Sequence, residues 1–120
     1  MSARLLTSLT VLAAVLAVGE FVSAIVITVE HYPDSQPAWA VVFGVLFLVV
    51  ALLLRTQRTV PGTVMALVLC LFEVVEYPAW ARHNMFDWVS QTIYAVVALA
   101  GLVVAIALLV TRWRSRGLTV

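Results

Sequence analysis

Four long apolar runs, separated by short polar connections, divide this chain. The runs cover residues 5–29, 38–54, 60–80 and 88–110. Each run is far longer than a typical strand, and none alternates apolar with polar residues, so the pattern predicts helices. At about 1.5 Å per residue, runs of this length can cross the roughly 30 Å hydrocarbon core of a bilayer.

The short connections predict how these helices are arranged. Backbone groups in lipid must be hydrogen-bonded within their own segment, and short connections make successive helices antiparallel. We therefore predict an all-α integral membrane protein, a four-transmembrane-helix up-down-up-down antiparallel bundle forming one membrane domain over residues 1–120. The first run, with small residues at Ser23 and Ala24, also resembles a signal peptide with a cleavage site. Its apolar pattern continues to Val29, which favours a spanning helix, but the sequence leaves cleavage open.

Composition supports the membrane interpretation. The chain is 64% hydrophobic and 11% charged, whereas soluble domains average roughly 45–50% apolar and about 25% charged residues. The net charge of +1 gives no argument for a nucleic-acid partner. Lysine is absent and Ala and Val are frequent, which indicates a GC-rich bacterial genome and hence a bacterial plasma membrane. A single cysteine, Cys70, excludes an intrachain disulfide and is interpreted as a packing residue.

The arginines predict the orientation. In a four-span topology Arg82 falls on one side, and the other six arginines fall on the opposite side: Arg4, Arg55, Arg58, Arg112, Arg114 and Arg116. The positive-inside rule then places both termini in the cytoplasm and the connections at 30–37 and 81–87 outside.

Carboxylates inside the apolar runs are the main candidates for chemistry. Glu20 lies nine residues before Val29, at a depth of about 14 Å, and Glu73 lies seven residues before Trp80, at roughly 10 Å. Glu76 is shallower. Ionisable residues at such depth are costly and mark functional sites by default.

Small and polar residues share one stripe on each of three helices, at 100° per residue. The stripes comprise Ala13, Ala17, Glu20, Ser23, Ala24, Ile27 and His31 in the first run, Gly62, Ala66, Cys70, Glu73, Glu76, Tyr77 and Trp80 in the third, and Asp87, Gln91, Tyr94, Ala98, Gly101 and Ala105 in the fourth. Membrane helices pack through such residues, so we expect the stripes to face one another. Ala98 and Gly101 should lie at a helix contact, and Val104 on another face.

This interior predicts a site for a proton or a cation, open toward the outside. The candidate binding residues are Glu20, Glu73, Glu76, Gln91 and Tyr94. An ionised carboxylate near the bilayer centre costs on the order of 2.5–3.5 kcal/mol, so at least one of the buried carboxyls should be protonated at neutral pH. The alternative is a structural role, in which Glu20 and Glu73 stay neutral and hydrogen-bond Gln91 or Tyr94.

A second polar group lies in the outer connections. His31, His83 and Asp87 could gather there, but no pair has metal-ligand spacing, so we expect no metal and no cofactor.

Four spans in 120 residues with a glutamate in the first are similar to the small multidrug resistance transporters. Glu20 and the chain length carry this resemblance, which implies a transporter. The acidic pair Glu73 and Glu76 departs from that family's pattern.

The favoured function is a non-catalytic accessory or oligomeric membrane component with an outward-facing acidic interior. Its partners would be the lipid bilayer, a larger membrane complex or a second copy of the chain. A proton- or cation-coupled small-solute transporter is the alternative. A membrane isomerase or cyclase using Glu20 and Glu73 as acid and base is the third hypothesis.

Overall fold

The chain folds into four helices. We analysed a computed structural model that describes residues 3–29, 35–79 and 85–119. These residues form α1 (Ala3–Val29), α2 (Ser35–Arg55), α3 (Thr59–Glu76), a single 3-10 turn η1 (Tyr77–Ala79) and α4 (Met85–Thr119). No strand occurs in these three ranges, so the predicted all-helical class is confirmed.

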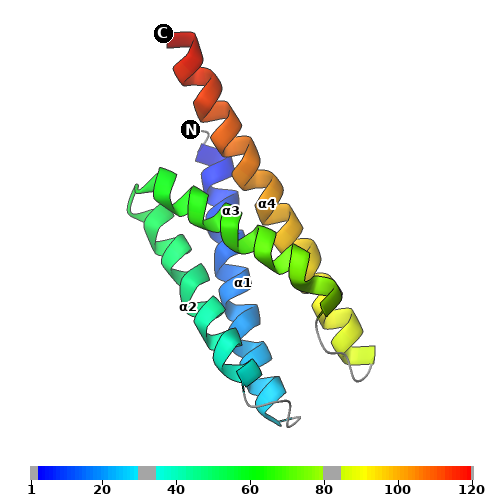
Figure 1. The fold of residues 1–120 in the computed structure, drawn as a ribbon. Coiled ribbons are helices and arrows are strands. Elements are labelled where there is room, and N and C mark those ends of the chain that lie inside the picture. The colour runs from blue at the N-terminus through cyan, green and yellow to red at the C-terminus, as the bar shows by residue number, and fades with distance from the viewer. Residues whose placement is uncertain (1–2, 30–34, 80–84, 120) are drawn as a thin grey trace.

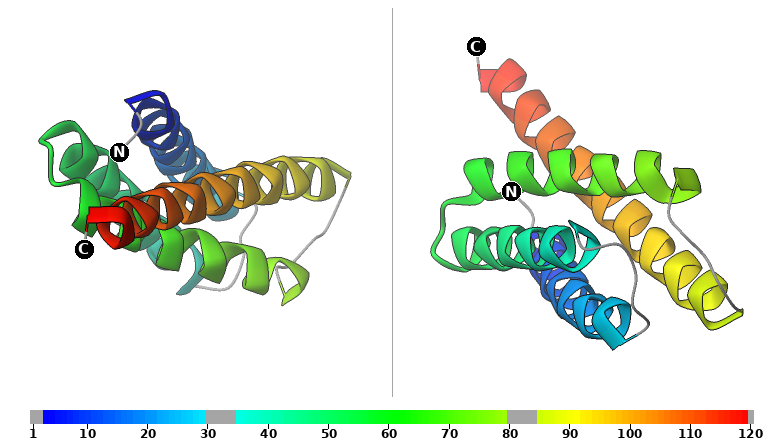
Figure 2. Two further views of the ribbon diagram at one scale, coloured as in Figure 1. Left: turned by 90° about the horizontal axis from the view of Figure 1, so that it is seen from above. Right: turned by 60° about the horizontal axis from the view of Figure 1, so that its bottom comes forward.

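The helices alternate in direction, and both chain ends lie at the same end of the bundle (Figure 1). α1 packs against α2 and α4, and α3 packs against α4 and α2. The diagonal pair, α1 and α3, meets over a short stretch only. α3 crosses α4 obliquely in each view (Figures 1 and 2). The bundle measures 55 × 25 × 20 Å.

Three helices, α1, α3 and α4, are long and apolar enough to cross a membrane, and α2 contains a shorter apolar segment, Trp39–Arg55. The outward faces carry large apolar side chains: Val18, Ile25 and Val75 are 62%, 66% and 69% exposed. A soluble protein rarely presents so continuous an apolar surface to water. The outside of this bundle therefore suits lipid, as expected of an integral membrane protein.

The first three helices begin and end within a few residues of the predicted positions, whereas the last helix ends nine residues later than predicted. α2 begins at Ser35, which places Pro37 in its first turn, where a missing N–H costs little. α4 runs to Thr119 rather than 110, because the arginine-rich tail contains good helix formers and no proline. Trp113 on this extension is 76% exposed. The extension projects past the first residues of α1 (Figure 1).

A tight turn reverses the chain between α2 and α3. Gln57 adopts the left-handed conformation, with φ of 66°. The backbone N–H of Arg58 donates to the carbonyl of Leu53 at 2.9 Å, which closes the six-residue ring of a Schellman motif. We call this end of the bundle, with the start of α1 and the end of α4, the arginine end. The opposite end, where α1 and α3 finish and α2 and α4 start, is the acidic end.

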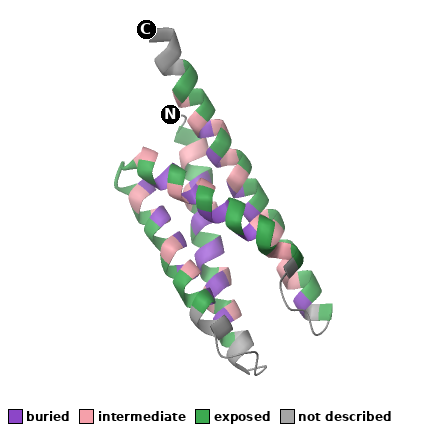
Figure 3. Cartoon of the chain, in the orientation of Figure 1, coloured by how far each residue is buried: buried purple, intermediate pink, exposed green. Residues whose placement is uncertain are grey.

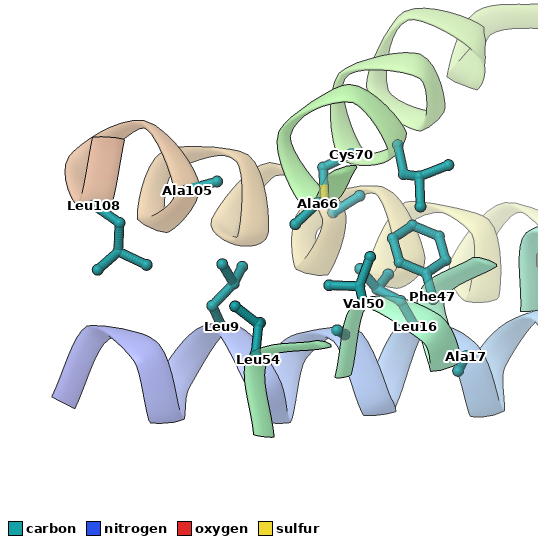
Figure 4. Packing of buried hydrophobic residues seen from close by; sticks show 13 residues of the cluster. Leu9, Leu16, Ala17, Phe47, Val50, Leu54, Ala66, Cys70, Ala105 and Leu108 are labelled. Carbon is teal, nitrogen blue, oxygen red and sulfur yellow. The ribbon is translucent and has the colours of Figure 1, made fainter. Parts of the chain in front are cut away.

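The core is apolar and draws on all four helices (Figures 3 and 4). Side chains that are less than 2% exposed, such as Leu9, Phe47, Val50 and Leu108, interlock with small residues. The small residues of this core cluster are Ala13, Ala17, Ala66, Cys70, Ala98 and Ala105. Small residues let membrane helices approach closely. Van der Waals contacts then stabilise the bundle, because the hydrophobic effect does not drive helices together in lipid.

Candidate functional site

Two carboxyl groups meet inside the bundle. Glu20 on α1 is 8% exposed and Glu73 on α3 is 5% exposed. Their carboxyl groups lie within hydrogen-bonding reach of each other. These two residues therefore connect the diagonal helices, which otherwise share little contact.

Tyr94 brings α4 into the same cluster. Its hydroxyl donates a hydrogen bond to Oε1 of Glu20 at 2.5 Å. The ring lies over Gly19, where an added Cβ would come within 3.2 Å of two ring carbons. A glycine beside Glu20 thus lets the tyrosine approach α1 closely enough to reach the carboxyl. Residues of α1, α3 and α4 thus form one buried polar cluster.

The carboxyl–carboxyl contact has a chemical consequence. A carboxylate only accepts hydrogen bonds, so two carboxyl groups can bond to each other only when one of them carries a proton. Two ionised groups would place like charges side by side in an apolar interior, which is costly. The geometry therefore defines a place for one shared proton.

No arginine of the described ranges lies near enough along its helix to neutralise the pair instead. Arg4 is sixteen residues before Glu20, and Arg58 is fifteen residues before Glu73. At 1.5 Å per residue, these separations are about 24 and 22 Å. The charges of the pair must be balanced locally, and a proton is the simplest group that does so.

The other expected site residues lie farther toward the acidic end. Glu76, one turn beyond Glu73, is exposed and lies outside the buried pair, although its position on the stripe predicted an interior location. Gln91 is half-buried on α4, one turn before Tyr94. Asp87 was expected in a connection but occupies the first turn of α4, where it is 4% exposed.

The predicted outer polar group is represented by Asp87 alone, because His31 and His83 lie outside the described residues. Within the described ranges, no three His, Cys, Asp or Glu residues are placed to hold a metal ion.

Close packing borders the pair on the side of the arginine end. Cys70, one turn from Glu73, lies against Gly101 of α4, where an added Cβ would come 2.9 Å from Sγ. Ala98 is fully buried, so both residues predicted to lie at a helix contact do so. Val104, however, is partly buried against the core, so the prediction of a separate face was wrong.

Two residues of this region escaped the sequence-based analysis. Gly19 belongs to none of the three predicted stripes, yet it makes room for Tyr94. Thr92 shares a hydrogen bond of 2.8 Å with the hydroxyl of Tyr77, which joins η1 to α4. The signal that could have identified Gly19 is its position next to the buried Glu20. No sequence signal identifies Thr92, because its contact with Tyr77 depends on how α3 packs against α4.

Comparisons of this chain with protein-family models, with curated proteins and with solved structures found no match. Its function must therefore be inferred from its own residues and their geometry.

Proposed function

We propose that this protein is a non-catalytic integral membrane component whose interior takes up and releases one proton at the Glu20–Glu73 pair. The observation that carries this proposal is the close approach of two buried carboxyls, with Tyr94 donating a hydrogen bond to Glu20. Such a pair binds one proton and repels a second negative charge. A small cation could replace the proton in the same position.

Proton release would act on the packing of the bundle. The pair joins α1 to α3, and these belong to different hairpins, α1–α2 and α3–α4. Loss of the shared proton would leave two like charges at the short contact between the diagonal helices and push them apart. The same coupling supports the second candidate, a proton- or cation-coupled small-solute transporter, because transport requires such a link between charge and conformation.

The setting follows from the arginine asymmetry and from the apolar exterior. We place the protein in the plasma membrane of a bacterium, with both termini in the cytoplasm and the acidic end outside. Its partner would be a larger membrane complex or a second copy of the chain. Affinity purification from mild detergent, followed by cross-linking, should recover one of these. A monodisperse monomer after cross-linking in the membrane would exclude that part of the proposal.

The proton site itself can be tested by infrared difference spectroscopy of the purified protein across pH. The wild type should show the C=O stretch of a protonated carboxyl group that disappears as pH rises. Glu20→Gln and Glu73→Gln should each shift the frequency and the titration pH of this band, because one carboxyl is left without its acidic partner, and the double variant should remove it. Helicity and thermal stability should be preserved, because Gln keeps the shape and most of the hydrogen bonding.

The exposed Glu76 supplies the matched control. Glu76→Gln changes the same functional group on the same helix, but it should leave the titrating band in place because Glu76 is exposed and lies outside the buried pair. A wild-type protein with no protonated-carboxyl band at any pH would refute the proposal. So would a band that remains unchanged in the double variant Glu20→Gln and Glu73→Gln.

A further inference from the structure

The polar residues around the pair are distributed on one side only. On α4, Asp87, Gln91 and Tyr94 follow one another at spacings of four and three residues, so they lie on one face between the acidic end and Glu20. On α3, Glu76 continues from Glu73 in the same direction and is exposed. Polar side chains thus lead from the acidic end to the pair along two helices.

The other side is closed by apolar packing. From the pair to the arginine end, the buried hydrophobic residues include Leu16 and Leu9 on α1, Phe47 on α2 and Leu108 on α4. Thr63 is fully buried there, but its hydroxyl donates to the carbonyl of Thr59 at 2.6 Å within its own helix. This part of the core offers a proton no continuing chain of polar side chains.

The two distances differ as well. Glu20 lies nine residues from the last residue of α1 and seventeen from its first. These separations correspond to about 14 Å toward the acidic end and about 26 Å toward the arginine end. The shorter route is lined by polar side chains, and the longer one by apolar side chains.

Titratable groups facing the pair come from three helices. α1 contributes Glu20, and α4 contributes Tyr94 with Asp87 farther out. α3 contributes Cys70 and Glu73, with the exposed Glu76 farther out, and α2 has no titratable side chain between residues 35 and 54. No charged group of the described residues therefore lies on the arginine side within a turn of the pair.

From this asymmetry we infer that the Glu20–Glu73 pair exchanges its proton with the acidic end of the bundle only. The inference rests on the proposed proton site and specifies its regulation. The protein responds to the pH of one compartment, outside in the predicted orientation, and does not conduct protons across the membrane. A chain of side chains and intervening water along α4 is the route, with Gln91 as its middle member.

The test uses wild-type protein in sealed vesicles, whose orientation is measured by trypsin cleavage at the α2–α3 turn. The pH is raised in the outer medium alone, and the protonated-carboxyl band is followed by time-resolved infrared spectroscopy. The band should decay at once only in the fraction of protein whose acidic end faces outward. The remaining fraction should respond after a proton ionophore equalises the two sides.

Two variants locate the route. Gln91→Leu should slow the immediate phase on the order of tenfold, because a proton must pass an apolar step. Cys70→Ala, one turn from the pair on the apolar side, should leave the rate unchanged. Neither should alter the total amplitude.

An immediate response of all the protein, whatever its orientation, would overturn the one-sided inference and leave the proton site intact. An immediate response confined to the protein whose arginine end faces outward would also overturn the inference and leave the proton site intact. Absence of the titrating band from every sample would instead refute the proposed function itself.

Discussion

The hydrogen bond from Tyr94 to Glu20 gives the most direct measure of how strongly the carboxyl pair ties the helices together. Tyr94→Phe removes one hydroxyl and keeps the ring over Gly19, so the change isolates a single bond of 2.5 Å. We expect the variant to fold and to be less stable, because Glu20 loses a donor inside an apolar interior.

The size of the effect can be bounded. Hydrogen bonds between membrane helices average about 0.6 kcal/mol and reach about 1.7 kcal/mol in double-mutant cycles, less than the roughly 1.5–3 kcal/mol of bonds to charged groups in water-soluble proteins. The membrane values apply here, since the unfolded helices in lipid also find polar partners. A short bond to a buried carboxyl belongs toward the upper of these values, so the free energy of unfolding should fall by about 1.5 kcal/mol.

The assay is reversible unfolding by SDS in mixed micelles, followed by circular dichroism. Tyr77→Phe is the matched control: it removes the same atom from a bond of 2.8 Å to Thr92 that lies on the exposed surface. A cycle with Glu20→Leu separates the bond from other effects of the mutation. A coupling energy within the additivity error of about 0.3–0.5 kcal/mol would refute the structural importance of this bond.

Three further predictions concern packing, backbone and orientation. Gly101→Leu should lower the free energy of unfolding in detergent by about 1–3 kcal/mol, because the added side chain would be overpacked against Cys70. Val103→Leu, at a position that is 58% exposed, should change this free energy little. Equal stability of the two variants would contradict the α3–α4 contact. Gln57→Gly should raise the free energy of unfolding by about 1 kcal/mol, because the left-handed conformation at φ of 66° costs glycine nothing, and a loss of stability would show that this turn is not under strain. In a Cys70→Ala background, a cysteine at Asn84 should react with a membrane-impermeant thiol reagent on intact cells while one at Gln57 should not, and the reverse result would invert the proposed orientation.

The sequence by itself determined the helices and the depth of the two buried carboxyls along them. Run lengths and the lack of period-two alternation predicted four helices, and the positions of Pro37 and Pro61 at the starts of α2 and α3 agree with their boundaries. The spacing of Glu20 and Glu73 from the helix ends also predicted that both carboxyls would be deep. These features depend on local backbone geometry and on the lengths of the apolar runs, and both can be read directly from the order of residues.

Only the tertiary structure decided which members of the three stripes meet. Periodicity gives the direction of a side chain around its own helix, but not the rotation or crossing angle of that helix against its neighbours. In lipid the exterior is as apolar as the core, so hydrophobicity does not indicate which face turns inward. The oblique path of α3 therefore brings Glu73 onto Glu20 and leaves Glu76 exposed, although the two residues are one turn apart. The space that Gly19 leaves for Tyr94 likewise arises from the contact of α1 with α4, a relation between segments 75 residues apart that no local pattern contains.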